Sequence, residues 1–93
     1  MDVDLSAVYR EDATLDEQVA AVQHLIDTGS VWSMDGSTGR WAAAMIEEGY
    51  CVLGEVEHRD YYGNRVPSRY QIAPGHVGSV EYARKLRPDR WPV

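Results

Sequence analysis

The side chains best suited to recognition in this chain gather in residues 58–69. Tyrosine and arginine are enriched at protein-binding hot spots because each combines a large contact area with directional hydrogen bonding. Two interpretations stay open, since these side chains either bind a partner or fold back over their own scaffold. In the second, Arg59 pairs with Asp60 and Arg65 with Glu57. The candidate binding residues are Arg59, Asp60, Tyr61, Tyr62, Asn64, Arg65 and Arg69.

Catalytic chemistry has little support in the sequence. Residues 58–60, His-Arg-Asp, share letters with the kinase catalytic loop, but the glycine-rich loop, the strand lysine and the Asp-Phe-Gly motif are missing. The histidines, His24, His58 and His76, lie far apart and lack a strong metal-ligand partner at i+2 to i+4. Residues 36–40, Gly-Ser-Thr-Gly-Arg, lack the P-loop spacing and lysine, so ordinary helix capping is favoured over anion binding. We expect no enzymatic activity, no cofactor and no metal.

A β-hairpin is predicted to carry the candidate residues. Residues 51–57 and 66–72 read as its paired strands, with residues 58–65 as the connection and Gly63-Asn64 as the tight turn. Alternation in the second strand places Val66, Ser68, Tyr70 and Ile72 on one face, and Pro67 indicates an edge strand or a bulge.

Three helices are predicted around the hairpin. The first starts with a capping box, Thr14 to Glu17, and stops at Gly29. Its apolar stripe is Leu15, Val19, Val22 and Ile26. After a brief strand or extended link at residues 31–34 and a turn at 35–39, a second helix is expected over residues 38–48. A short third helix over residues 80–87 follows its cap, Ser79.

These elements predict a small single-domain α+β fold. Its two main helices pack on a short antiparallel sheet that contains the hairpin, and a short C-terminal helix completes it. Residues 1–13 are expected to be a partly ordered acidic arm, 14–88 the domain and 89–93 a tail. The chain of 93 residues leaves no room for a second core. The predicted core is Val19, Val22, Ile26, Trp41, Met45, Val52 and Tyr70.

Cysteine content and hydropathy predict a cytoplasmic protein. The one cysteine, Cys51, excludes an intramolecular disulfide, and its apolar neighbours indicate a buried, inert thiol. No N-terminal run resembles a signal peptide, and no apolar run reaches the length of a membrane span. We therefore expect no membrane partner.

The net charge of −6 is unevenly distributed. Residues 1–49 hold ten acidic side chains against two arginines, a balance of −8, and residues 50–93 hold seven basic against five acidic, a balance of +2. Overall acidity disfavours non-specific nucleic-acid binding, which requires neutralisation of phosphates. The dipolar split is compatible with self-association, although a solvated acidic helix face explains it more simply.

The central two-thirds or so of the chain, residues 25–82, resembles a group of small proteins encoded by actinobacteriophages. The resemblance implies a phage origin and expression in the host cytoplasm, and it carries over no catalytic residue. Its motifs are Gly-Ser-x-Gly-Arg at residues 36–40, Gly-Tyr-Cys-x-Leu-Gly-Glu at 49–55, His-Arg-Asp-Tyr-x-Gly-Asn-x-Val-Pro-Ser-Arg at 58–69, and Pro-Gly-x-x-Gly-Ser-x-Glu-Tyr at 74–82.

Two functional hypotheses follow. The leading one is a non-enzymatic phage accessory protein, an interaction module that acts on a host or phage protein. The alternative is a winged-helix-like nucleic-acid-binding regulator, with residues 38–48 as recognition helix and residues 58–65 as wing. In that helix Arg40 is the sole basic residue, and Glu47 and Glu48 would face a polyanion. The sequence therefore favours a protein partner over nucleic acid.

Overall fold

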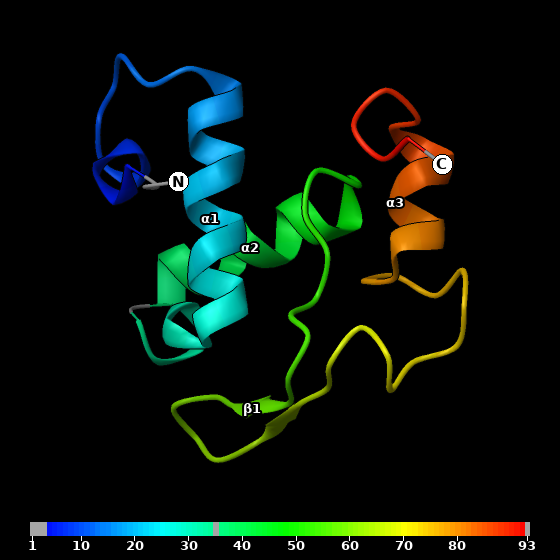
Figure 1. The fold of residues 1–93 in the computed structure, drawn as a ribbon. Coiled ribbons are helices and arrows are strands. Elements are labelled where there is room, and N and C mark those ends of the chain that lie inside the picture. Colours follow the sequence, from blue (N-terminus) through cyan, green and yellow to red (C-terminus); the bar gives the residue numbers. More distant parts are fainter. Residues whose placement is uncertain (1–3, 35, 93) are drawn as a thin grey trace.

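The computed structural model describes residues 4–34 and 36–92. Within them it contains three α-helices, two 3-10 helices and one two-stranded antiparallel sheet (Figure 1). The predicted α+β class and the C-terminal helix are confirmed. The elements in chain order are η1 (Leu5–Val8), α1 (Leu15–Thr28), η2 (Ser30–Ser33), α2 (Gly36–Glu47), β1 (His58–Arg59), β2 (Arg65–Val66) and α3 (Val80–Leu86).

Helix α1 begins and ends as its sequence signals predicted. The Thr14 hydroxyl accepts a hydrogen bond from the Glu17 backbone N–H at 3.1 Å, and the Glu17 carboxylate accepts one from the Thr14 N–H at 3.0 Å. Gly29 ends the helix with φ +82°, the left-handed conformation that glycine adopts without strain. The buried face of α1 consists of Ala21, Val22, Leu25 and Ile26.

The segment between the first two helices is helical, which corrects the predicted strand or extended link at residues 31–34. The Trp32 N–H bonds to the Gly29 carbonyl at 3.2 Å and the Met34 N–H to the Val31 carbonyl at 3.3 Å, which closes the 3-10 turn η2. Helix α2 begins at Gly36, earlier than the predicted Thr38, so residues 36–39 of the predicted turn belong to the helix. Asp35, the first residue of that turn, lies outside the described residues.

The predicted strands 51–57 and 66–72 are wrong in extent. Among the described residues only His58 pairs with Val66 and Arg59 with Arg65, so three of the four paired residues fall in the predicted connection and only Val66 falls in a predicted strand. Groups outside the hairpin satisfy the rest of the backbone: the Gln23 side chain accepts from the Val52 N–H at 2.9 Å, and the Gly78 carbonyl accepts from the Leu53 N–H at 3.0 Å. These bonds hold residues 52–53 beside α1 and residue 78. The backbone N–H groups of residues 52 and 53 are therefore already bonded and do not pair with a second strand.

The hydrophobic core lies between α1, η2, α2 and the segment that follows α2, and the two short strands lie at its edge (Figure 1). Of the predicted core, Val22, Ile26, Met45 and Val52 are buried, and Val19 and Trp41 pack against the cluster while partly exposed. Tyr70 is 70% exposed, so its assignment to the core is wrong, because residues 68–71 form a turn instead of a strand. The buried cluster is Val22, Leu25, Ile26, Val31, Ala42, Met45, Ile46 and Cys51.

Both ends of the described chain contact the domain. At the N-terminal end Ala7 is buried, and Arg10 forms ion pairs with Asp4 at 2.8 Å and Glu17 at 3.0 Å. At the C-terminal end Trp91 donates its indole N–H to the Gly49 carbonyl at 2.8 Å, and Arg90 pairs with Asp16 at 2.5 Å. Residues 1–3 of the predicted arm and residue 93 of the predicted tail lie outside the described residues.

Helix α3 starts at its predicted cap, since the Ser79 hydroxyl accepts from the Tyr82 N–H at 3.1 Å. The helix ends at Leu86, one residue before the predicted Arg87. In the part of the chain that the structure describes, no helix has the length and apolar character needed to cross a membrane.

The Cys51 thiol is fully buried, and burial raises its pKa from an ordinary value of 9.0 to about 12. We expect the native protein to react negligibly with a thiol reagent at pH 8, and the denatured protein to react fully. Because the folded pKa is the higher one, this group's contribution to stability is present below about pH 9 and is lost as the pH rises toward 12. Fast labelling of the native protein at pH 8 would contradict this burial.

Candidate binding site

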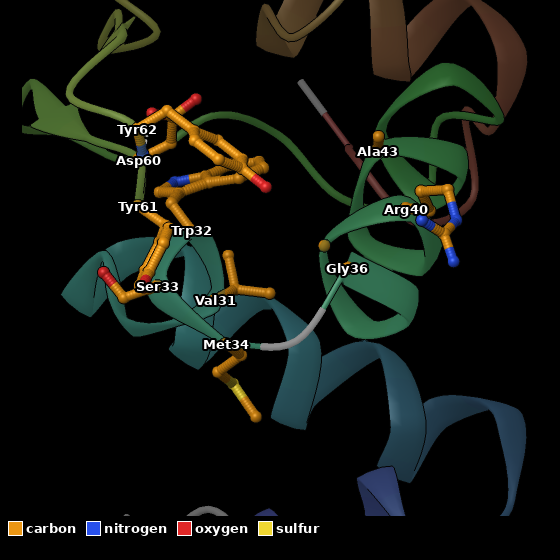
Figure 2. Close-up of a pocket in the computed structure, with 11 residues that line it drawn as sticks. Val31, Trp32, Ser33, Met34, Gly36, Arg40, Ala43, Asp60, Tyr61 and Tyr62 are labelled. Carbon is orange, nitrogen blue, oxygen red and sulfur yellow. Dashed lines mark hydrogen bonds between the residues drawn. The ribbon is translucent and has the colours of Figure 1, made fainter.

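A cavity of about 600 Å³ opens between the tip of the hairpin and the start of α2. One wall consists of residues 31–34 of η2 and its C-terminal side, together with residues 60–62 of the hairpin. The other consists of Gly36, Gly39, Arg40 and Ala43 of α2. Figure 2 shows the side chains of Trp32 and Tyr62 extending from the hairpin side toward the α2 wall. This cavity and its two walls are called the groove below.

The base of the hairpin is seated on the C-terminal end of α1. A ring nitrogen of His58 lies 3.2 Å from the Asp27 carbonyl oxygen. The ring also covers Gly29, where a Cβ atom would come within 2.3 Å of the imidazole. Glycine at this position therefore serves two purposes, because it adopts the positive φ and leaves space for His58.

Replacing Gly29 by alanine is expected to lower the free energy of unfolding by about 2 kcal/mol or more. Roughly 1–2 kcal/mol comes from a non-glycine residue in the left-handed region, and the rest from displacement of His58. Gly63→Ala is the matched control, since Gly63 also has φ +82° but nothing lies within 4 Å of its Cβ position. Denaturant unfolding should show the larger loss for Gly29→Ala, and His58→Ala in the same chain should reduce it. Equal losses at the two glycines would contradict the close packing.

Asp60 shapes the hairpin tip from within. One carboxylate oxygen accepts hydrogen bonds from the backbone N–H groups of Tyr62 at 2.9 Å and Asn64 at 2.8 Å. The other accepts from the Asn64 side-chain amide at 3.2 Å. The Tyr61 N–H bonds to the Trp32 carbonyl at 3.0 Å, which ties the tip to η2. Asp60 and Asn64 thus hold the loop in one conformation.

The three candidate arginines contact the hairpin and its scaffold. Arg59 donates to the Gly63 carbonyl at 2.9 Å, so the pairing with Asp60 that belonged to the second interpretation is wrong. Arg65 forms an ion pair with Glu57, as the second interpretation had it. The hydrogen bond from Arg65, and to a smaller extent the one from Gln71, holds the pKa of the Glu57 carboxyl below its usual range.

Arg69 attaches the chain after β2 to the body of the protein. Its Nε donates to the Leu53 carbonyl at 2.8 Å, and its Nη2 lies 3.5 Å from a carboxylate oxygen of Asp27 in α1. Its side chain is mostly buried. Arg69 therefore fixes the hairpin relative to α1 and lies away from the groove.

Tyr61 and Tyr62 are the aromatic members of the candidate residues, and both face solvent. They are 76% and 85% exposed, and their rings contact each other edge to face with centroids 5.3 Å apart. Tyrosines this exposed, on a loop whose backbone is internally bonded, offer rigid aromatic area at the mouth of the groove.

Sequence reasoning missed the residues that complete the groove, chiefly Trp32, Met34 and Arg40. The available signal was a tryptophan in a short apolar segment between Gly29 and Gly36. Their meeting with Tyr61 and Tyr62 depends on the seating of the hairpin on α1, which is a tertiary property.

The groove offers aromatic faces, hydroxyl and indole donors and one guanidinium group. In residues 4–34 and 36–92 no three His, Cys, Asp or Glu side chains gather in a way that would hold a metal ion. Comparisons with protein-family models, curated proteins and solved structures found no match to this chain. The chemistry of the groove is therefore the remaining guide to function.

Proposed function

We propose that this protein is a non-enzymatic interaction module that binds another protein through the groove, with Tyr61 and Tyr62 as its anchors. The observation that carries the proposal is the exposure of these two neighbouring rings, 76% and 85%, at the mouth of a cavity. Tyrosine side chains that become buried when a partner binds supply much of the binding energy at protein interfaces. Clusters of exposed aromatic side chains in the free protein are typical of such sites.

The fixed shape of the loop supports the same function. Ordering a loop on binding costs free energy, so a loop that is already ordered binds more tightly for the same contacts. Three hydrogen bonds to Asp60 and one from Tyr61 to Trp32 provide this order before a partner arrives. Tyrosine adds area at low entropic cost because it has few rotatable bonds.

The resemblance of residues 25–82 to small actinobacteriophage proteins supports a phage accessory role. On this proposal the protein acts in the host cytoplasm, and its partner is a host or phage protein. Self-association is the other outcome for the same surface, and it is distinguished by measuring the mass of the isolated protein in solution.

The winged-helix alternative has weaker support. Two of the three arginines that would approach phosphate, Arg65 and Arg69, already pair with Glu57 and Asp27. The exposed Glu47 and Glu48 at the end of α2 would repel a polyanion. Salt-dependent binding to mixed-sequence duplex DNA would restore this alternative.

The test is capture of a partner from an actinobacterial lysate by the tagged protein. We expect a partner to be retained by the native chain and lost by the double variant Tyr61→Ala/Tyr62→Ala. The matched control is Tyr9→Ala/Tyr70→Ala, which removes two tyrosines of similar exposure, 72% and 70%, outside the groove. Retention by both double variants would show that the partner binds elsewhere.

A further inference from the structure

We infer that the groove binds an extended, proline-containing segment of the partner that carries an acidic residue beside the prolines. This inference rests on the proposed function and specifies the chemistry of the partner. Three features carry it: the aromatic lining, the shortness of the available strand edges, and an arginine at the rim that forms no ion pair with any residue in 4–34 and 36–92.

The aromatic lining suits proline. Trp32, Tyr61 and Tyr62 line the groove together, and Figure 2 shows the rings of Trp32 and Tyr62 projecting on the same side. Proline-rich segments in the polyproline II conformation dock between such rings, since the pyrrolidine ring is compact and apolar and the extended conformation is already formed. Their carbonyl groups make no internal hydrogen bonds and need donors. The indole N–H of Trp32 and both hydroxyls have no partner among the described residues and are available to donate.

The strand edges argue against an added β-strand. Peptides that extend a sheet need a row of free backbone groups along an edge strand. Here β1 and β2 have only two residues each, and they pair with each other. A peptide in this groove must therefore hold its own extended shape, which proline provides at low entropic cost.

Arg40 specifies the acidic residue. It belongs to the α2 wall, where its guanidinium lies over Gly36, with Nη1 3.0 Å from the Cβ position of that glycine. The part of the chain that the structure describes gives Arg40 no ion pair. The one described carboxylate in the groove, that of Asp60, is occupied by its own loop. A carboxylate on the peptide would therefore complete the charge pairing at this rim.

The total charge limits how acidic the segment is. The chain carries a net charge of −6, so a highly acidic peptide is repelled at long range. A single carboxylate next to the prolines gains the contact with Arg40 and avoids most of this repulsion. A nucleic acid carries many phosphates, so one contact with Arg40 does not offset its repulsion by the negatively charged protein.

The test is a titration of the native protein with three blocked hexapeptides at low salt. Binding is measured from the changes in the protein's backbone amide chemical shifts in NMR spectra. The first is Pro-Pro-Ala-Pro-Pro-Glu, the second ends in lysine, and the third has alanine at every proline. We expect the glutamate peptide to bind about threefold more tightly than the lysine peptide, as for an exposed ion pair. The alanine peptide should bind at least about tenfold more weakly, because the ring contacts are lost.

Variants connect these differences to the groove. Arg40→Gln should remove the preference for glutamate, whereas Lys85→Gln, at an exposed position on α3, should keep it. Tyr62→Ala should weaken both proline peptides about tenfold. Three results would overturn the inference. They are an alanine peptide that binds as tightly as the proline peptides, glutamate and lysine peptides that bind the native protein equally, and no binding of any proline peptide. If a lysate partner still depends on Tyr61 and Tyr62 in those cases, the proposed function stands; if capture is also independent of the tyrosines, both fail.

Discussion

Replacing Ile26 by alanine is expected to lower the free energy of unfolding by about 2–5 kcal/mol, the range for truncating a buried isoleucine. Among the described residues Ile26 has the largest fully buried side chain, and it belongs to the cluster formed by α1, η2, α2 and Cys51. Since small domains are stable by only about 5–15 kcal/mol, this one change removes a large share of the total.

Urea unfolding followed by circular dichroism measures this effect. The control is Val56→Ala, a change at a side chain that is 63% exposed, and its expected effect is within about 0.5 kcal/mol. The slope of the transition should stay the same for both variants, because neither alters the surface exposed on unfolding by much. A loss below about 1 kcal/mol at Ile26 would mean that the core lies elsewhere.

Removing both groove tyrosines is expected to weaken binding of the purified partner by about 30-fold or more, the effect of losing a hot-spot side chain. The loss should appear mainly as faster dissociation. The thermal midpoint should change little, because Tyr61 and Tyr62 are exposed and contribute no core contact.

Surface plasmon resonance with the immobilised partner provides the measurement. The variant Tyr61→Phe/Tyr62→Phe keeps the ring area and removes only the hydroxyls, so it should retain most of the affinity if packing dominates. A double alanine variant that binds as tightly as the native chain would contradict the anchoring role. A fall in affinity together with a fall in the thermal midpoint would point instead to a structural role for the tyrosines.

The helices were predictable from the sequence because their signals are local. The capping box at Thr14, the left-handed Gly29 and the serine cap at Ser79 act within a few residues of themselves. The strands were predicted from alternation alone, which says nothing about hydrogen-bond partners. The Gln23 side chain and the Gly78 carbonyl, distant in sequence, bond to the backbone of residues 52 and 53 and shorten the ladder.

The candidate site was predictable in part for the same reason. Tyr61 and Tyr62 are exposed in a charged turn, as the composition of residues 58–65 indicates. Trp32 lies on the same wall as Tyr61 and Tyr62, and Arg40 lies on the facing wall. This arrangement depends on the packing of His58 against Gly29, which no local pattern encodes. Likewise, the attachment of Arg69 to Asp27 and Leu53 requires the folded chain.

Site-specific photo-crosslinking tests the central claim, that the groove is the binding surface. A photoreactive phenylalanine analogue replaces Tyr62 in one protein and Tyr9, at a similarly exposed position outside the groove, in another. After irradiation in the lysate, the protein labelled at position 62 should form a covalent adduct with the partner recovered by capture, and the protein labelled at position 9 should not. An adduct from position 9 alone would contradict the claim and place the partner on the N-terminal segment before α1.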